Sequence, residues 1–148
     1  MPSKEMEAEE AQERSLPSSM PLKVTLNGYQ QAAMMTAIYP GRMLSTTFGD
    51  PKRSLQEEII ARCYVGLKLT GEAGEVTELL GKALRDDNGI ITHERREKLK
   101  LELGDVLWYV AALASELGFK LSEISDSNLE KLARRKAEGK LKGSGSDR

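Results

Sequence analysis

The chain has 148 residues, a net charge of −1, 30% charged residues and only 5% aromatic residues. This length suits one domain with one core, and the near-neutral charge excludes the basic field that drives nucleic-acid binding. No apolar run reaches the ~18 residues of a membrane span, and the N-terminus lacks the apolar segment of a secretory signal. Because Cys63 is the only cysteine, no internal disulfide can form, and we expect a cytoplasmic protein in which Cys63 is buried.

The N-terminal segment, residues 1–24, is acidic and then rich in Pro and Ser, with no sustained apolar face. This composition predicts a flexible arm. A helical domain is expected over residues 25–138. Its first helix is predicted from about Leu26 to Ile38, where Pro40 and Gly41 end it.

The start of the second helix is predicted from Ser54-Leu55-Gln56-Glu57. This is a capping-box pattern, and apolar residues at helical spacing follow it. It is expected to reach Arg85, either unbroken or bent near Gly71. Thr92 is a candidate N-cap for a third helix that runs to Leu117 and stops at Gly118.

A fourth helix is predicted from Ser122 to about Glu138, and residues 139–148 read as a flexible tail. No strand pattern is present, so the predicted fold is an all-α antiparallel bundle of four to five helices. On the third helix the spacing predicts an apolar seam facing the core, formed by Leu99, Leu103, Val106, Val110, Leu113 and Leu117. A second face around Trp108 predicts subunit packing, so that oligomerisation completes the bundle.

Four acidic residues stand in two pairs, Glu72 and Glu75 on the second helix and Glu102 and Asp105 on the third. A three-residue spacing puts the members of each pair one turn apart on one helix face. Glu102 and Asp105 lie roughly 60° and roughly 120° from Leu99, on the flank of the core seam that Tyr109 shares.

If the two helices pack with these pairs facing, four carboxylates share a small volume and repel one another. Hard oxygen ligands without thiol or imidazole suit Mg²⁺ or Mn²⁺, which would offset that repulsion. Gly71, Gly74 and Gly104 flank the acids, and the missing side chains predict close approach by a partner helix or a ligand. The alternative is that these are ordinary exposed acids.

The stretches "GLKLTGEAGEVTELLGKALRDD" and "KLELGDVLWYVAALASELG" together resemble the MazG-type all-α nucleoside triphosphate pyrophosphohydrolases. That family carries E-x-x-E on one helix and E-x-x-D on the next, which match Glu72, Glu75, Glu102 and Asp105. The resemblance covers roughly residues 26–148. It implies Mg²⁺-dependent cleavage of the α–β bond of a nucleoside or deoxynucleoside triphosphate, with the four acids as metal ligands and catalytic groups, by a dimer or tetramer.

The resemblance also implies substrate contacts by Asn128, Lys131 and Arg135, which lie on one face of the fourth helix, and by Tyr109. The basic residues could hold phosphates, or they could form a solvated face favoured by the helix dipole. Tyr109 could instead be a core residue.

Three functions stay open from the sequence. One is nucleotide-pool house-cleaning by pyrophosphohydrolysis, and a close variant is hydrolysis of phosphoribosyl-ATP. The third is a non-catalytic helical oligomer that acts as an interaction or regulatory module, in which case the acids would be surface residues.

Overall fold

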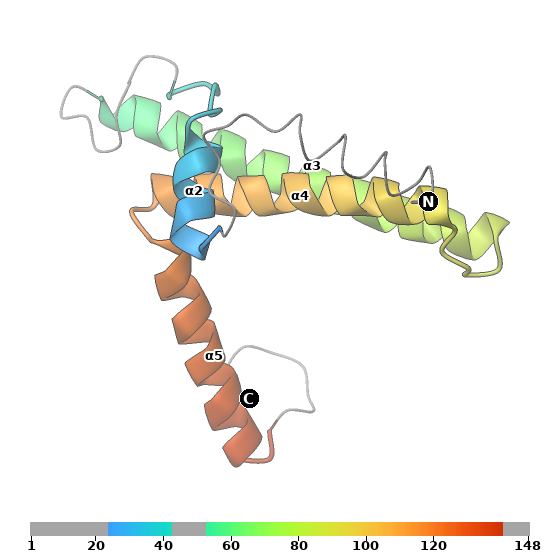
Figure 1. The fold of residues 1–148 in the computed structure, drawn as a ribbon. Coiled ribbons are helices and arrows are strands. Elements are labelled where there is room, and N and C mark those ends of the chain that lie inside the picture. The colour runs from blue at the N-terminus through green and yellow to red at the C-terminus, as the bar shows by residue number, and fades with distance from the viewer. Residues whose placement is uncertain (1–23, 43–52, 141–148) are drawn as a thin grey trace, which may run out of the picture.

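The computed structural model describes residues 24–42 and 53–140, which contain four helices and no strand (Figure 1). These are α2 (Leu26–Met34), α3 (Leu55–Asp86), α4 (His93–Glu116) and α5 (Leu121–Ala137). The all-α prediction is therefore confirmed. The predicted arm before residue 24, and the predicted tail from residue 141, lie outside the described residues. No helix in the described part is both long enough and apolar enough to cross a membrane.

The two long helices α3 and α4 form an antiparallel hairpin, whose interface is the largest between any two of the described helices (Figure 1). At the start of α3, Ser54 Oγ accepts the Glu57 N–H and the Glu57 carboxylate accepts the Ser54 N–H, so the capping box is confirmed. Thr92 caps α4 as predicted, because its Oγ1 accepts the Arg95 N–H. The helix α3 runs unbroken from Leu55 to Asp86, which confirms the predicted continuous helix.

The core lies where α2 crosses the C-terminal half of α4 (Figure 1). Small residues dominate it, with Ala111 and Ala112 of α4 and Ala61 and Val65 of α3 fully buried. Trp108 packs against this cluster, and its indole N–H donates to Thr36 Oγ1 at 2.9 Å. The C-terminal half of the face predicted to contact another subunit is thus covered by α2 and the residues that follow it in the same chain.

The last helix, α5, projects away from the hairpin and packs on α2 (Figure 1). Two amide side chains of α2 fix its start. The Gln30 Oε1 accepts the Leu121 N–H at 2.9 Å, and the Asn27 Oδ1 accepts the Ser122 N–H at 3.0 Å. These bonds satisfy backbone donors that every helix leaves open at its N-terminus. Beyond this anchor, α5 leaves Leu129 and Leu132 exposed.

Several sequence predictions need correction. The first helix ends at Met34 rather than at Ile38. Just after this end, the Thr36 hydroxyl donates to the Ala33 carbonyl. Cys63 is exposed rather than buried, because Ala61 and Val65 turn the adjacent faces of α3 inward. Along the predicted α4 seam, Leu103 and Leu117 are exposed. The spacing located an apolar face correctly, but no element of the described chain covers all of it.

Candidate metal centre

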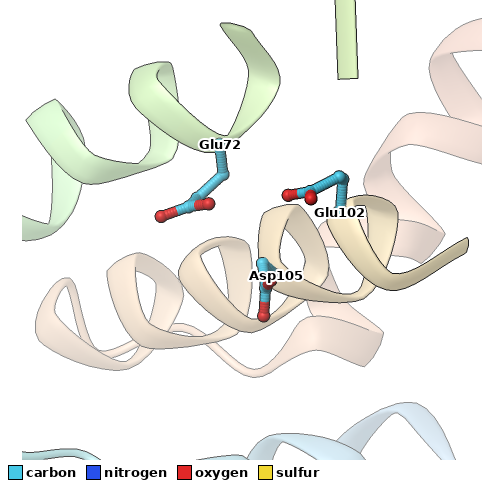
Figure 2. A group of neighbouring side chains, drawn as sticks. All are labelled: Glu72, Glu102 and Asp105. Carbon is cyan, nitrogen blue, oxygen red and sulfur yellow. The ribbon is translucent and has the colours of Figure 1, made fainter. Parts of the chain in front are cut away.

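Three of the four predicted acids converge between the long helices (Figure 2). Glu72 extends from α3 on the side that faces α4, where Glu102 and Asp105 stand one turn apart. One carboxylate oxygen from each residue lies within 4.8 Å of the other two. The antiparallel hairpin therefore brings the two acidic motifs together, which is the facing arrangement that the helical spacing alone leaves open.

Burial across this acidic cluster is graded. The Glu72 side chain is only 11% exposed, Glu102 is half-buried and Asp105 is open to solvent. Loss of hydration raises the pKa of Glu102, and the charges of Glu75, Asp105 and Glu72 raise it further. The clustered charges thus disfavour one another. Hard divalent cations bind several carboxylate oxygens that lie close together. The carboxylates of the acidic cluster therefore fit Mg²⁺ or Mn²⁺.

Glu75 is the fourth predicted ligand, and it is exposed on α3 one turn beyond Glu72. It does not belong to the group whose oxygens come within 4.8 Å of one another. Its charge nevertheless acts on Glu102, since it is the largest electrostatic contribution to the raised pKa of that carboxyl. Glu75 therefore lies at the edge of the acidic cluster.

Tyr109 lies on the acidic flank of α4, as its position on the helix predicts. The Lys68 Nζ of α3 is 5.8 Å from the centre of the Tyr109 ring and 2.9 Å from Glu72 Oε1. Trp108 meets Tyr109 edge-on, with ring centres 4.8 Å apart. Tyr109 thus joins the acidic cluster to the aromatic part of the core.

Two residues near the cluster, Lys68 and Tyr29, are not among the predicted site residues. Burial raises the pKa of the Tyr29 hydroxyl and the nearby charge of Asp105 raises it further, so α2 brings this tyrosine close to the acids. Lys68 precedes Glu72 by four residues, and this i,i+4 spacing was a readable signal. Nothing in the sequence around Tyr29 indicates its position, which depends on how α2 crosses α4.

The predicted substrate residues of α5 lie elsewhere. Asn128 and Lys131 line a cavity of about 830 Å³ between α2, α4 and α5, together with Leu107 of α4. Leu107 is about 200° around the helix from Asp105, and so faces away from the acidic cluster. Arg135 Nε donates to the Lys140 carbonyl at 3.4 Å. The single chain does not bring these three residues to its own acids.

Comparison with known proteins adds two findings. The family model described as the MazG nucleotide pyrophosphohydrolase domain matches residues 65–139, a span that holds all four acids and excludes α2. The chain is also 47% identical over 120 residues to the "Gene 37 protein" of Mycobacterium phage L5. The aligned residues cover 81% of this chain and 96% of the phage protein. No solved structure was found to match the chain.

Proposed function

Because the chain belongs to the MazG nucleotide pyrophosphohydrolase family, we propose that it splits nucleoside or deoxynucleoside triphosphates into the monophosphate and pyrophosphate. The observation that carries this proposal is the convergence of Glu72, Glu102 and Asp105 from two facing helices. A triphosphate brings negative charge into a site that is itself negative. Cleavage there requires cations, and carboxylate oxygens are the ligands that hold them.

Glu72, Glu102 and Asp105, with Glu75 at their edge, hold Mg²⁺ in this proposal, and Mn²⁺ can substitute. When bound, such an ion would neutralise phosphate charge and lower the pKa of water, so that hydroxide is available near neutral pH. A carboxylate oxygen of the four acids that does not hold the ion would accept the proton of this water. Tyr109, half-buried beside Glu72, contacts the substrate at the inner edge of the site.

We further propose that the protein works as a homo-oligomer, a dimer or a tetramer, in which α5 of one copy reaches the acidic cluster of another. The supporting observation is charge complementarity. The α5 face that carries Asn128, Lys131 and Arg135 is basic, and it also exposes Ile124 and Leu132. The hairpin face that carries the acids is negative, and the neighbouring Leu103 is uncovered.

Glycines on the hairpin are compatible with such an approach. A Cβ atom added at Gly71, Gly74 or Gly104 would meet no atom within 4 Å in the described chain. The close approach predicted at these positions is therefore not made within one copy. In this proposal a second copy or a bound nucleotide approaches the hairpin there.

The biological role that fits this chemistry is removal of surplus or aberrant nucleotides from the cytoplasmic pool. The deciding experiment incubates the protein with Mg²⁺ and a panel of canonical and modified nucleoside triphosphates, including phosphoribosyl-ATP. We expect pyrophosphate as the first product. Orthophosphate as the first product would contradict α–β cleavage. No turnover of any member, together with no binding of divalent ions, would favour a non-catalytic helical module.

A further inference from the structure

One basic side chain in the described chain is paired with the acidic cluster. Lys68 Nζ lies 2.9 Å from Glu72 Oε1 and 5.8 Å from the centre of the Tyr109 ring. Lys68 is 41% exposed, whereas the Glu72 side chain is 11% exposed. The ammonium group therefore stands at the mouth of the cluster, over its most buried acid.

This pair differs from an ordinary surface pair on the same helix. Lys82 and Glu78 have the same i,i+4 spacing, but Glu78 is 63% exposed and water can solvate it. A buried carboxylate such as Glu72 needs a counter-charge, since an unpaired buried charge is costly. Lys68 supplies this charge, and its ammonium group also lies 5.8 Å from the centre of the Tyr109 ring.

The positive charge of Lys68 does not neutralise the acidic cluster. Lys68 is paired with Glu72 alone, whereas Glu102 and Asp105 complete the cluster and Glu75 lies at its edge, so the site keeps a net negative charge. Divalent ions would compete with Lys68 for the Glu72 oxygen. Once an ion holds that oxygen, the ammonium has no further role there. Its long, half-exposed side chain can then turn toward an anion bound above the acids.

We propose that Lys68 is an exchangeable counter-ion, which pairs with Glu72 in the ion-free protein and pairs with a phosphate oxygen of the substrate once divalent ions occupy the acids. The proposal rests on the proposed function, because it needs both the ions and the triphosphate. It adds that one side chain couples the two binding events. Tyr109 offers the ammonium a cation–π contact between its two positions.

The coupling predicts effects of opposite sign when Lys68 is replaced. Loss of a competing positive charge strengthens binding of a metal ion, because the Glu72 carboxylate is already available. Loss of the same charge weakens binding of the triphosphate, because a phosphate contact disappears. A purely structural role for Lys68 would weaken both binding events together.

The experiment compares the wild-type protein with Lys68→Met and with the matched control Lys82→Met. Titration calorimetry first measures Mn²⁺ affinity without nucleotide. It then measures, at saturating Mn²⁺, the affinity for the non-hydrolysable α,β-imido analogue of the best substrate from the nucleotide panel. For Lys68→Met we expect Mn²⁺ binding about threefold to tenfold tighter and analogue binding about tenfold weaker. Lys82→Met should match the wild type in both.

Lys68→Arg guards against a folding artefact, because it keeps the positive charge and should return Mn²⁺ affinity to within about twofold of the wild type. Unchanged affinities in Lys68→Met, or a parallel loss of both, would overturn the counter-ion proposal while leaving the metal site intact. A wild-type protein that binds no Mn²⁺ would overturn the metal site itself, and the proposal with it.

Discussion

A carboxylate oxygen of Glu72 on α3 lies within 4.8 Å of a carboxylate oxygen of Asp105 on α4 (Figure 2). Like charges at this separation oppose the packing of the two helices. Repulsion between the acids of the site therefore lowers the stability of the α3–α4 hairpin that brings them together. A cation held between the helices would reverse this effect, so that ion binding and hairpin stability are linked.

The first prediction concerns this linkage. Mg²⁺ or Mn²⁺ should raise the melting temperature by several degrees, since an ion at about 100 times its Kd adds about 2.7 kcal/mol to the free energy of unfolding. Thermal unfolding followed by circular dichroism, with a chelator and then with excess ion, measures the shift. An equal shift with the same ionic strength of NaCl would show that general screening, rather than a site, is responsible.

Glu102→Gln gives a second prediction. The raised pKa of Glu102 reports that its charged form is disfavoured beside the other acids, so the neutral amide should stabilise the ion-free protein slightly. The same change should abolish most of the stabilisation by Mn²⁺ and most of the nucleotide hydrolysis. Melting curves with and without Mn²⁺ measure both effects. A variant that melts lower without ion, yet keeps the full ion-dependent rise, would contradict this role for Glu102.

The proposed sharing of sites between copies gives a third prediction. Glu72→Gln and Lys131→Met should each be nearly inactive alone, the first through the ion site and the second through the phosphate contact. Mixing the two variants should restore part of the activity, because some sites then combine intact acids with an intact α5. Steady-state assays of the mixture measure this recovery.

The control for that experiment mixes Glu72→Gln with Glu102→Gln. Both substitutions affect the same α3–α4 cluster of a single copy, so no exchange of subunits can rebuild a complete site. Recovery in this control, or no recovery with Lys131→Met in an exchanging oligomer, would argue that α5 does not serve a neighbouring site.

A second charged cluster lies at the far end of α4, around Glu116. The Tyr39 hydroxyl donates to Glu116 Oε1 at 2.6 Å, and Arg53 Nη2 is 2.8 Å from Glu116 Oε2. Arg62 Nε donates to the Glu116 carbonyl at 3.1 Å. The Glu116 side chain is 1% exposed, so these partners replace the water that would otherwise surround its carboxylate. Burial and the Glu116 carboxylate both raise the pKa of Tyr39, which keeps its proton as the donor.

Glu116→Gln is therefore our fourth prediction. It leaves the guanidinium of Arg53 buried without its counter-charge, and breaking a buried pair in this way costs about 3 kcal/mol of unfolding free energy. Urea unfolding measures the loss, and the exposed Glu130→Gln serves as the control. The double variant Arg53→Met with Glu116→Gln should lose less than the two single losses combined. Additive losses would mean that the pair does not act as a unit.

The sequence was most informative where local chemistry decides the structure. The caps at Ser54 and Thr92 predicted the starts of α3 and α4, because a side-chain oxygen there meets a free backbone N–H. The three-residue spacing of Glu102 and Asp105 predicted their shared face, because helical geometry fixes it. The convergence on Glu72 needs the two acidic faces to meet across the hairpin, and helical spacing alone does not decide this.

Contacts between helices could not be predicted from local sequence patterns. Periodicity identifies an apolar face but does not identify its cover, so the Trp108 face was predicted to meet another subunit when α2 covers much of it. The Glu116 cluster was not predicted, because Tyr39 and Arg53 come from segments with no helical pattern. The direction of α5 was not predicted either, since it depends on the amide bonds from Asn27 and Gln30.

The most direct test of the central claim is a Mn²⁺ titration, followed by electron paramagnetic resonance, of the wild type, Glu72→Gln on α3 and Asp105→Asn on α4. The account predicts that the wild type binds Mn²⁺ and that each single change, on either helix, weakens binding at least about tenfold, since each removes a charged oxygen ligand. Glu123→Gln on α5 should bind as the wild type does. Full Mn²⁺ affinity in either Glu72→Gln or Asp105→Asn would contradict the claim that both helices hold a common ion.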